Sequence, residues 1–369
     1  MLLNRTQKGF SLIELMISLT LGLLISAAVM QVYLTSIKTS SVQSGGTDIL
    51  EASIFGIQNI EKSIRLSNLG MADSNNPFTP LAGVVMTSDT SLVSASQTDK
   101  SKNNMNGIKM GGTVTSAGTD AIDAKYLTKS GIAASNITGL TSSQLTIQYE
   151  APQDMYDCEG TLVRGPIEIE RDGRLELIPG QVIVQRYFLR EVAQNDKSNY
   201  ESNIKSYELR CDAGRYVKEI LNSAELDLQK INDSTILKES RNIRDFGDIG
   251  EVVIPRVDYF GVLLGVEVVE VVEPLTSSVT LRYFTPEQYM SYLKGLATDS
   301  TITTDIISVK LSALVRADRP LTGETGASNF IIFGEPKTLS ADTSKAFIRR
   351  VYESNIMLRN SRAIKESSI

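Results

Sequence analysis

The first forty residues divide into a short polar leader and a long apolar run. The leader carries Arg5 and Lys8 and ends at Gly9. From Leu15 to Ile37 no residue carries a formal charge, and as a helix this run is about 34 Å long, enough to cross the hydrocarbon core of a bilayer. The pattern predicts a membrane helix with its basic leader on the cytoplasmic side.

Helical periodicity continues beyond this run. A polar stretch ending in Gly45 and Gly46 follows, and the Gly pair makes a bend plausible there. Apolar residues then recur at heptad-like spacing up to Gly70, a natural helix stop. We therefore expect one helix from Phe10 to about Asn68, apolar in its first half and amphipathic in its second. The apolar residues of the second half are Leu50, Ile54, Ile57 and Ile64.

The remaining chain changes character twice. A connecting region, 71–143, is rich in Ser, Thr and Gly, and its part from Thr87 to Thr119 reads as a long surface loop. From 144 onward, runs of β-branched and aromatic residues predict a single β-rich head packed on the amphipathic half of the helix, an α+β fold. Expected strands cover 145–149, 182–189, 207–211, 252–260, 262–272, 279–284 and 306–315, with a short helix at 286–296 and either a strand or a helix at 347–358.

Composition narrows the chemistry. The 369 residues include no His, which removes His-based triads, His metal sites and the usual neutral-pH proton shuttle. Two Cys are too few for a structural zinc site. A formal net charge of −6 argues against a general nucleic-acid binder. We expect no enzyme activity, no cofactor and no metal.

Three interpretations of the leader compete. A plain signal anchor is one, and a secretory signal cleaved near Ser26-Ala27-Ala28 is another. Neither of these signals accounts for Glu14. A carboxylate at the start of an apolar helix is energetically costly, and neither signal requires one. The third uses every feature, since the run Gly9-Phe10-Ser11-Leu12-Ile13-Glu14-Leu15 resembles the class III signal of type IV pilins and pseudopilins.

That resemblance implies processing and a role in assembly. A prepilin peptidase would cut between Gly9 and Phe10 and methylate the new N-terminus on Phe10. Glu14 would become the fifth residue of the 360-residue mature chain. In this family the acid at that position pairs with an N-terminal amine as a new subunit docks.

Further motifs narrow the resemblance to PilW-like minor pilins, with similarity also to J-type minor pseudopilins. They are Leu145-Thr-Ile-Gln-Tyr149, Asp157-Cys158-Glu-Gly160, Arg186-Tyr-Phe-Leu189, Leu209-Arg-Cys211, Arg349-Arg350-Val351 and Leu358-Arg359-Asn360. The implied fold is pilin-like: leader 1–9, membrane and assembly helix 10–38, amphipathic continuation 39–70, connecting region 71–143 and periplasmic head 144–369.

The same resemblance implies a minor pilin anchored in the inner membrane, with its head in the periplasm, that primes pilus assembly and ends near the tip of the surface pilus. Implied partners are other minor pilins, the major pilin, a large tip adhesin, the prepilin peptidase and the inner-membrane assembly platform. The alternative is a minor pseudopilin of a type II secretion system. Twitching, adhesion and DNA uptake all remain open as the use of the pilus, as do the contacted minor pilins and the role of the Ser/Thr-rich segment.

Cys158 and Cys211 are the only cysteines, each in or beside a strand-like run. A periplasmic head would lie in an oxidising compartment, where a disulfide is the default for two Cys. Two free buried thiols are the alternative.

Two charged clusters offer other functions. The acids Glu267, Glu270 and Glu273 suggest either a cation site or, more simply, a solvated hairpin. A C-terminal basic set would meet DNA, meet an acidic partner or face solvent: Lys345, Arg349, Arg350, Arg359, Arg362 and Lys365. A DNA-binding module predicts a continuous basic surface there, and a membrane enzyme predicts a pocket of convergent polar groups.

Overall fold

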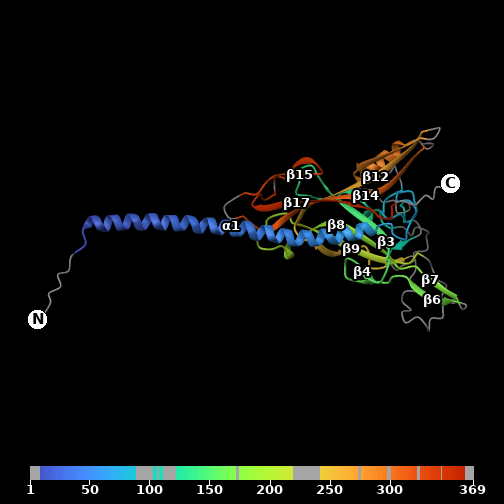
Figure 1. Cartoon of the computed structure of the whole chain (residues 1–369), viewed down its shortest axis with the longest axis horizontal. Coiled ribbons are helices and arrows are strands. Elements are labelled where there is room, and N and C mark those ends of the chain that lie inside the picture. The colour runs from blue at the N-terminus through green and yellow to red at the C-terminus, as the bar shows by residue number, and fades with distance from the viewer. Residues whose placement is uncertain are drawn as a thin grey trace.

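The computed structural model describes residues 9–88, 103–105, 108–110, 122–171, 174–218, 242–272, 276–296, 301–321, 325–341 and 343–361. One long helix, α1 (Leu12–Leu66), carries an elongated head at its C-terminal half (Figure 1). The Glu267, Glu270 and Glu273 cluster lies only in part within these residues, because Glu273 is outside them, as are Arg362 and Lys365 of the C-terminal basic set.

Helix α1 is continuous where the sequence suggested a bend. It runs through Gly45 and Gly46 without interruption and has no Pro. Gly45 is buried, and a Cβ there would lie 3.4 Å from the Cβ of Ala317, so the small residue lets the helix approach the head. The helix ends at Leu66, and Asn68 with φ 69° turns the chain away. Packing against the head therefore outweighs the intrinsic cost of the Gly pair.

Five strands form the sheet nearest the disulfide, in the order β11-β9-β8-β3-β2. Their bounds are β2 (Lys129–Ala133), β3 (Ser142–Glu150), β8 (Val182–Glu191), β9 (Tyr207–Tyr216) and β11 (Glu251–Ile254). The β3–β8–β9 ladder is antiparallel and regular. β2 lies inside the connecting region 71–143, beyond the part expected to be a loop, and it pairs with β3 at that edge of the sheet.

A four-stranded antiparallel sheet has the order β13-β12-β14-β17. Its strands are β12 (Val257–Val272), β13 (Thr276–Phe284), β14 (Ile302–Pro320) and β17 (Phe347–Met357). The stretch at 347–358, which the sequence left undecided, is thus a strand paired with β14. The run expected as one strand at 252–260 is interrupted at Pro255-Arg256, where Arg256 has φ 56°, and this turn separates β11 from β12.

The stem and both sheets share one core. Ile60 and Ile64 of α1 are fully buried against apolar residues of both sheets. At Gly56 an added Cβ would lie 2.8 Å from the carbonyl oxygen of Val253, so only glycine permits this approach of α1 to β11. The short helix α3 (Pro286–Gly295) begins with a Thr285 capping box and Pro at its first turn, as its sequence predicts.

Among its described residues, the head also contains several short strand pairs and two 3-10 turns. They are β1 (Lys109–Met110) with β10 (Asn242–Ile243), β4 (Met155–Tyr156) with β5 (Leu162–Val163), β6 (Ile167–Arg171) with β7 (Arg174–Ile178), β15 (Asn329–Ile332) with β16 (Glu335–Thr338), and the 3-10 turns Ala124–Tyr126 and Gln194–Asp196. The β6–β7 and β12–β13 hairpins lie at the end of the head that is far from the N-terminus (Figure 1).

Candidate functional site

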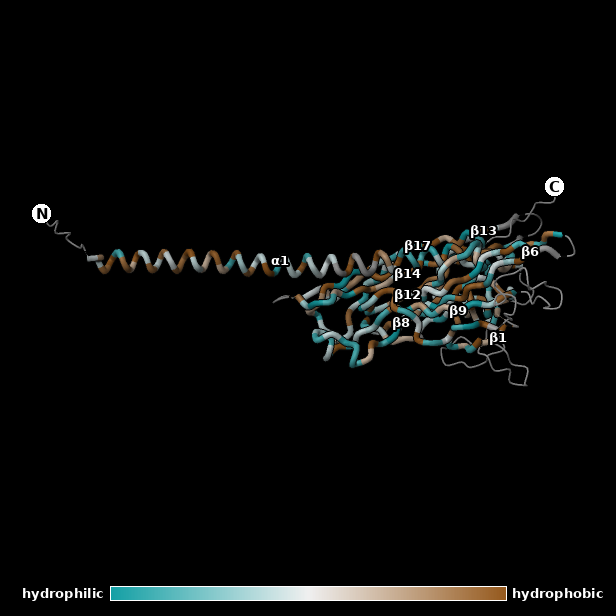
Figure 2. The backbone as a smooth tube through the Cα atoms, turned by 90° about the horizontal axis from the view of Figure 1, so that it is seen from below, coloured by the Kyte–Doolittle hydropathy of each residue, from teal (hydrophilic) through white to brown (hydrophobic). Residues whose placement is uncertain are grey.

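The N-terminal half of α1 stands clear of the head. The span 12–47 contains an 18-residue window with a mean hydropathy of 2.2, and this window is 0% buried, so the helix is long and apolar enough to cross a membrane. Figure 2 shows this bare apolar segment extending away from the sheets. Apolar side chains that the head leaves uncovered need another environment, either lipid or the helices of neighbouring subunits.

Glu14 lies in the first turn of α1 and completes a capping box with Ser11. The Ser11 amide donates to Glu14 Oε2 at 3.0 Å, and the Ser11 hydroxyl donates to the same oxygen at 3.1 Å. In return the Glu14 amide donates to Ser11 Oγ at 3.3 Å. The pattern S-x-x-E closes the helix start and places a negative charge at the positive end of the helix dipole.

This local geometry adds a detail that the sequence interpretation lacked. Within the described part of the chain, the Glu14 carboxylate accepts hydrogen bonds from the amide and the hydroxyl of Ser11. Ser11 directly follows Phe10, the residue expected to become the N-terminus after cleavage. The signal was available in the sequence as a capping box, S-x-x-E ahead of an apolar run. A positive amine on Phe10 would therefore start next to a carboxylate that is already oriented.

Cys158 and Cys211 are joined by a disulfide with a Cα separation of 6.2 Å, as expected. It ties the loop after β4 to the middle of β9, so the loop lies against the sheet. A groove of about 680 Å³ opens beside it, between α1 and the sheet. Its lining is mainly apolar and aromatic, with Lys62 and Asp157 as its charged side chains. That lining differs from the convergent polar pocket that a membrane enzyme predicts.

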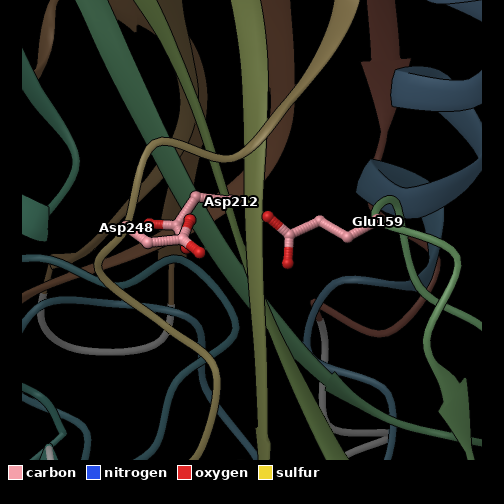
Figure 3. Close-up of side chains that lie close together, drawn as sticks. All are labelled: Glu159, Asp212 and Asp248. Carbon is pink, nitrogen blue, oxygen red and sulfur yellow. The ribbon is translucent and has the colours of Figure 1, made fainter.

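The disulfide also brings carboxylates together. Glu159 follows Cys158 and Asp212 follows Cys211, and their carboxylate oxygens lie within 4.8 Å of each other and of Asp248 (Figure 3). Burial, with the negative charges of Asp248 and Asp212, raises the pKa of Glu159 to about 8. The Asp212 carboxylate is satisfied within the protein, by Arg186 at 2.7 Å and by the Gly247 amide. A protonated Glu159 relieves the repulsion.

Among the described C-terminal basic residues, one is buried and does not contribute to the basic surface that a DNA-binding module predicts. Arg349 is buried, and its Nε donates to Asp258 Oδ2 at 2.6 Å. Its neighbour across the strands, Arg316, is also buried and pairs with Glu201 and Asp258. Burial in these ion pairs withdraws Arg349 from the surface. Of the described members, Lys345, Arg350 and Arg359 remain exposed.

A comparison with a known family agrees with the N-terminal geometry. The profile of the prokaryotic N-terminal methylation motif matches residues 4–30, the segment that holds Gly9, Phe10 and Glu14. Among solved structures, the chain is similar to a type IV-like pilin from Thermus thermophilus, with 12% identity and a TM-score of 0.24 over 60% of this chain and 80% of that one. No curated protein matches the sequence.

Proposed function

We propose that this chain is a type IV pilin-like protein, and specifically a minor type IV pilin, a proposal supported by the methylation motif, the long apolar helix and the antiparallel sheets. One observation carries the proposal: a head of two large sheets and several hairpins sits on a stem of the pilin type. A head this bulky suits an end position better than a unit repeated along a thin filament.

The proposed role is to prime assembly and remain near the pilus tip. Before assembly the stem lies in the inner membrane and the head lies in the periplasm, where an oxidising compartment suits the Cys158–Cys211 disulfide. The prepilin peptidase removes residues 1–9, and the assembly platform passes the mature chain to other minor pilins, the major pilin and a large tip adhesin.

Glu14 is the docking residue in this proposal. A carboxylate among apolar side chains costs about 2–3 kcal/mol in a bilayer unless it is paired. Ser11 supplies hydrogen bonds but no positive charge. An N-terminal amine at Phe10, on the same subunit or the next, would supply that charge and set the axial register of the entering subunit.

The test separates charge from helix capping. Glu14→Gln keeps the side-chain length and a capping acceptor but removes the charge, whereas Ser11→Ala keeps the charge and breaks the capping box. Both variants are expressed as the full chain, and mass spectrometry first establishes that cleavage follows Gly9 in each. We expect Glu14→Gln to accumulate normally in the membrane yet to be lost from sheared pili. Ser11→Ala should still be incorporated.

Normal incorporation of Glu14→Gln would contradict the docking role. Deleting the gene tests the wider proposal, because loss of a priming subunit should reduce the number of surface pili while purified pili contain little of the protein. A secretion defect with unchanged pili would instead support a minor pseudopilin of a type II secretion system, which shares every feature of the stem. Finding the chain as the main filament subunit would refute the minor role.

A further inference from the structure

Strand β13 carries its apolar side chains on the face that the head leaves open. Val279, Leu281 and Tyr283 alternate along one face and are 58%, 49% and 40% exposed. The opposite face of β13 continues the surface of β12 that bears the buried Val266 and Val268, yet there β13 places Arg282 and Thr280, their cross-strand neighbours. Residues 278–283 are exposed on both faces of the strand, and the apolar stripe lies on one of them.

β13 is also the terminal strand of the four-stranded sheet, and no strand among the described residues pairs with its outer side. Its nine residues pair with β12 in continuous register without a bulge, and they include no Pro and a single charged side chain, Arg282. A regular apolar edge strand presents a row of backbone donors and acceptors to any other extended chain. Proteins normally shorten, charge, bend or cover such edges, so an exception needs a reason.

The other terminal strands of the two large sheets show these protections. β11 has four residues and β2 has five, and both are interrupted by a register shift. β17 is longer but contacts α1 and the β15 strand. Among the strands that the structure describes in the two large sheets, β13 alone combines length, regular register and exposed apolar side chains on its outer edge.

We propose that β13 is the acceptor edge for an extended strand of a different protein, which adds to the sheet beyond β13. The added strand is amphipathic, with an aliphatic or aromatic residue at every second position. These residues lie across from Val279, Leu281 and Tyr283, and polar residues lie across from Thr280 and Arg282. The partner strand would be recognised by backbone hydrogen bonds along β13 and by apolar contacts on one face of the sheet.

Geometry selects a different protein over a second copy. The β12–β13 hairpin points away from the N-terminus, with its strands broadly along the direction of α1 (Figures 1 and 2). Pairing β13 with itself antiparallel requires a two-fold axis perpendicular to the strands. That axis would also point the stem of the second copy in the opposite direction. Two stems in one membrane with their heads on the same side run in the same direction, so antiparallel pairing of β13 with a second copy is excluded there. The hairpin's position at the end far from the membrane segment fits a partner that sits ahead of this head.

The experiment places the photocrosslinker p-benzoyl-phenylalanine in the full-length chain, in cells, at positions 279, 280, 281 and 282 in turn. Strand addition predicts adducts to one other protein from all four positions, because an added strand borders both faces of the edge. Mass spectrometry of the adducts should show the crosslinked partner residue moving steadily in one direction as the position advances. Position 331 is the matched control, because Ile331 on β15 is equally exposed at 60%.

A substitution pair completes the test. Leu281→Lys should weaken crosslinking from position 280 by about tenfold or more, since it puts a charge into an apolar contact. Ile331→Lys should leave the yield unchanged, and both variants should keep the unfolding midpoint of the unmodified protein. Adducts from positions 279 and 281 alone, adducts to a second copy or within the chain, adducts without a register, or none would overturn the proposal.

The inference rests on the proposed function only for the presence of a partner in the same assembly. The two fail separately: pilus number after gene deletion tests the priming role, while the crosslink register tests the strand edge. A clear register with a protein outside any pilus would keep the edge and refute the pilus role.

Discussion

Removing the charge of Asp258 should strongly destabilise the head, because this carboxylate separates two buried guanidinium groups. Arg316 and Arg349 lie directly opposite each other on β14 and β17 and are almost fully buried. Asp258 accepts from Arg349 Nε at 2.6 Å and from the Asn136 side chain at 2.7 Å, and it lies 3.7 Å from Arg316 Nε. Like charges on facing positions are otherwise repulsive.

The magnitude follows from what Asp258→Asn leaves behind. Arg316 keeps Glu201, but Arg349 loses its carboxylate and remains buried beside another cation. Breaking one partner of a buried ion pair typically costs 3–5 kcal/mol, and the retained amide offsets part of that, so we expect about 3 kcal/mol. For a head of this size, with an m-value near 3 kcal/mol per molar urea, the midpoint should fall by about 1 M.

The assay is urea unfolding of the detergent-solubilised full chain, followed by far-ultraviolet circular dichroism. The matched control is Asp318→Asn, which makes the same substitution in a partly exposed pair with Arg256 at 3.6 Å and should cost less than about 1 kcal/mol. Equal shifts for the two variants would refute the reasoning, because they would mean that water reaches the buried guanidinium groups.

Three further outcomes are expected from the same unfolding assay. Gly56→Ala should destabilise by about 1–3 kcal/mol despite better helix propensity, because the new methyl group meets β11; an unchanged midpoint would contradict this close approach. Replacing Cys158 and Cys211 together by Ala should cost about 4 kcal/mol, from a 53-residue loop no longer closed, and a loss below about 1 kcal/mol would speak against that estimate. Because the folded pKa of Glu159 is raised to about 8, the folded state holds its proton longer, so stability should fall as pH rises from about 5 to above 8, by about 1 kcal/mol once solvent screening is allowed for; Glu159→Gln should flatten this slope.

The sequence predicted elements whose signal is local. The helix α1, the strands of the β3–β8–β9 ladder and the capped helix α3 all follow from periodicity and end signals within a few residues. The predicted bend at Gly45-Gly46 is absent. Gly45 packs close to Ala317, which lies far along the chain, so the local sequence gives no sign of this packing.

The charged sites were harder for the same reason. Arg349 belongs to a basic run that reads as surface, and its burial depends on Asp258, 91 positions away. Arg316 likewise depends on Glu201, 115 positions away. Part of the carboxylate cluster could have been predicted, because Glu159 and Asp212 each follow a cysteine of the expected disulfide. Asp248 joins the cluster only in the folded structure. Ion pairs between residues that are far apart in the sequence produce no periodic pattern from which a single sequence could predict them.

The uninterrupted stem has a mechanical consequence. Gly45 is the first buried residue of α1, and the 33 residues from Leu12 to Ser44 form a rod of about 50 Å between the helix start and the head. In the proposed membrane-anchored state, the apolar run would fill the bilayer, and the exposed polar turns after it would hold the head off the lipid surface by about 10 Å. A rod without a Pro hinge passes an axial push from its base to the head with little loss to bending. Under the proposed function, each helical turn by which the stem is lifted from the bilayer would raise the head by about 5 Å, so stepwise extraction of the stem would move the distal hairpins in equal steps.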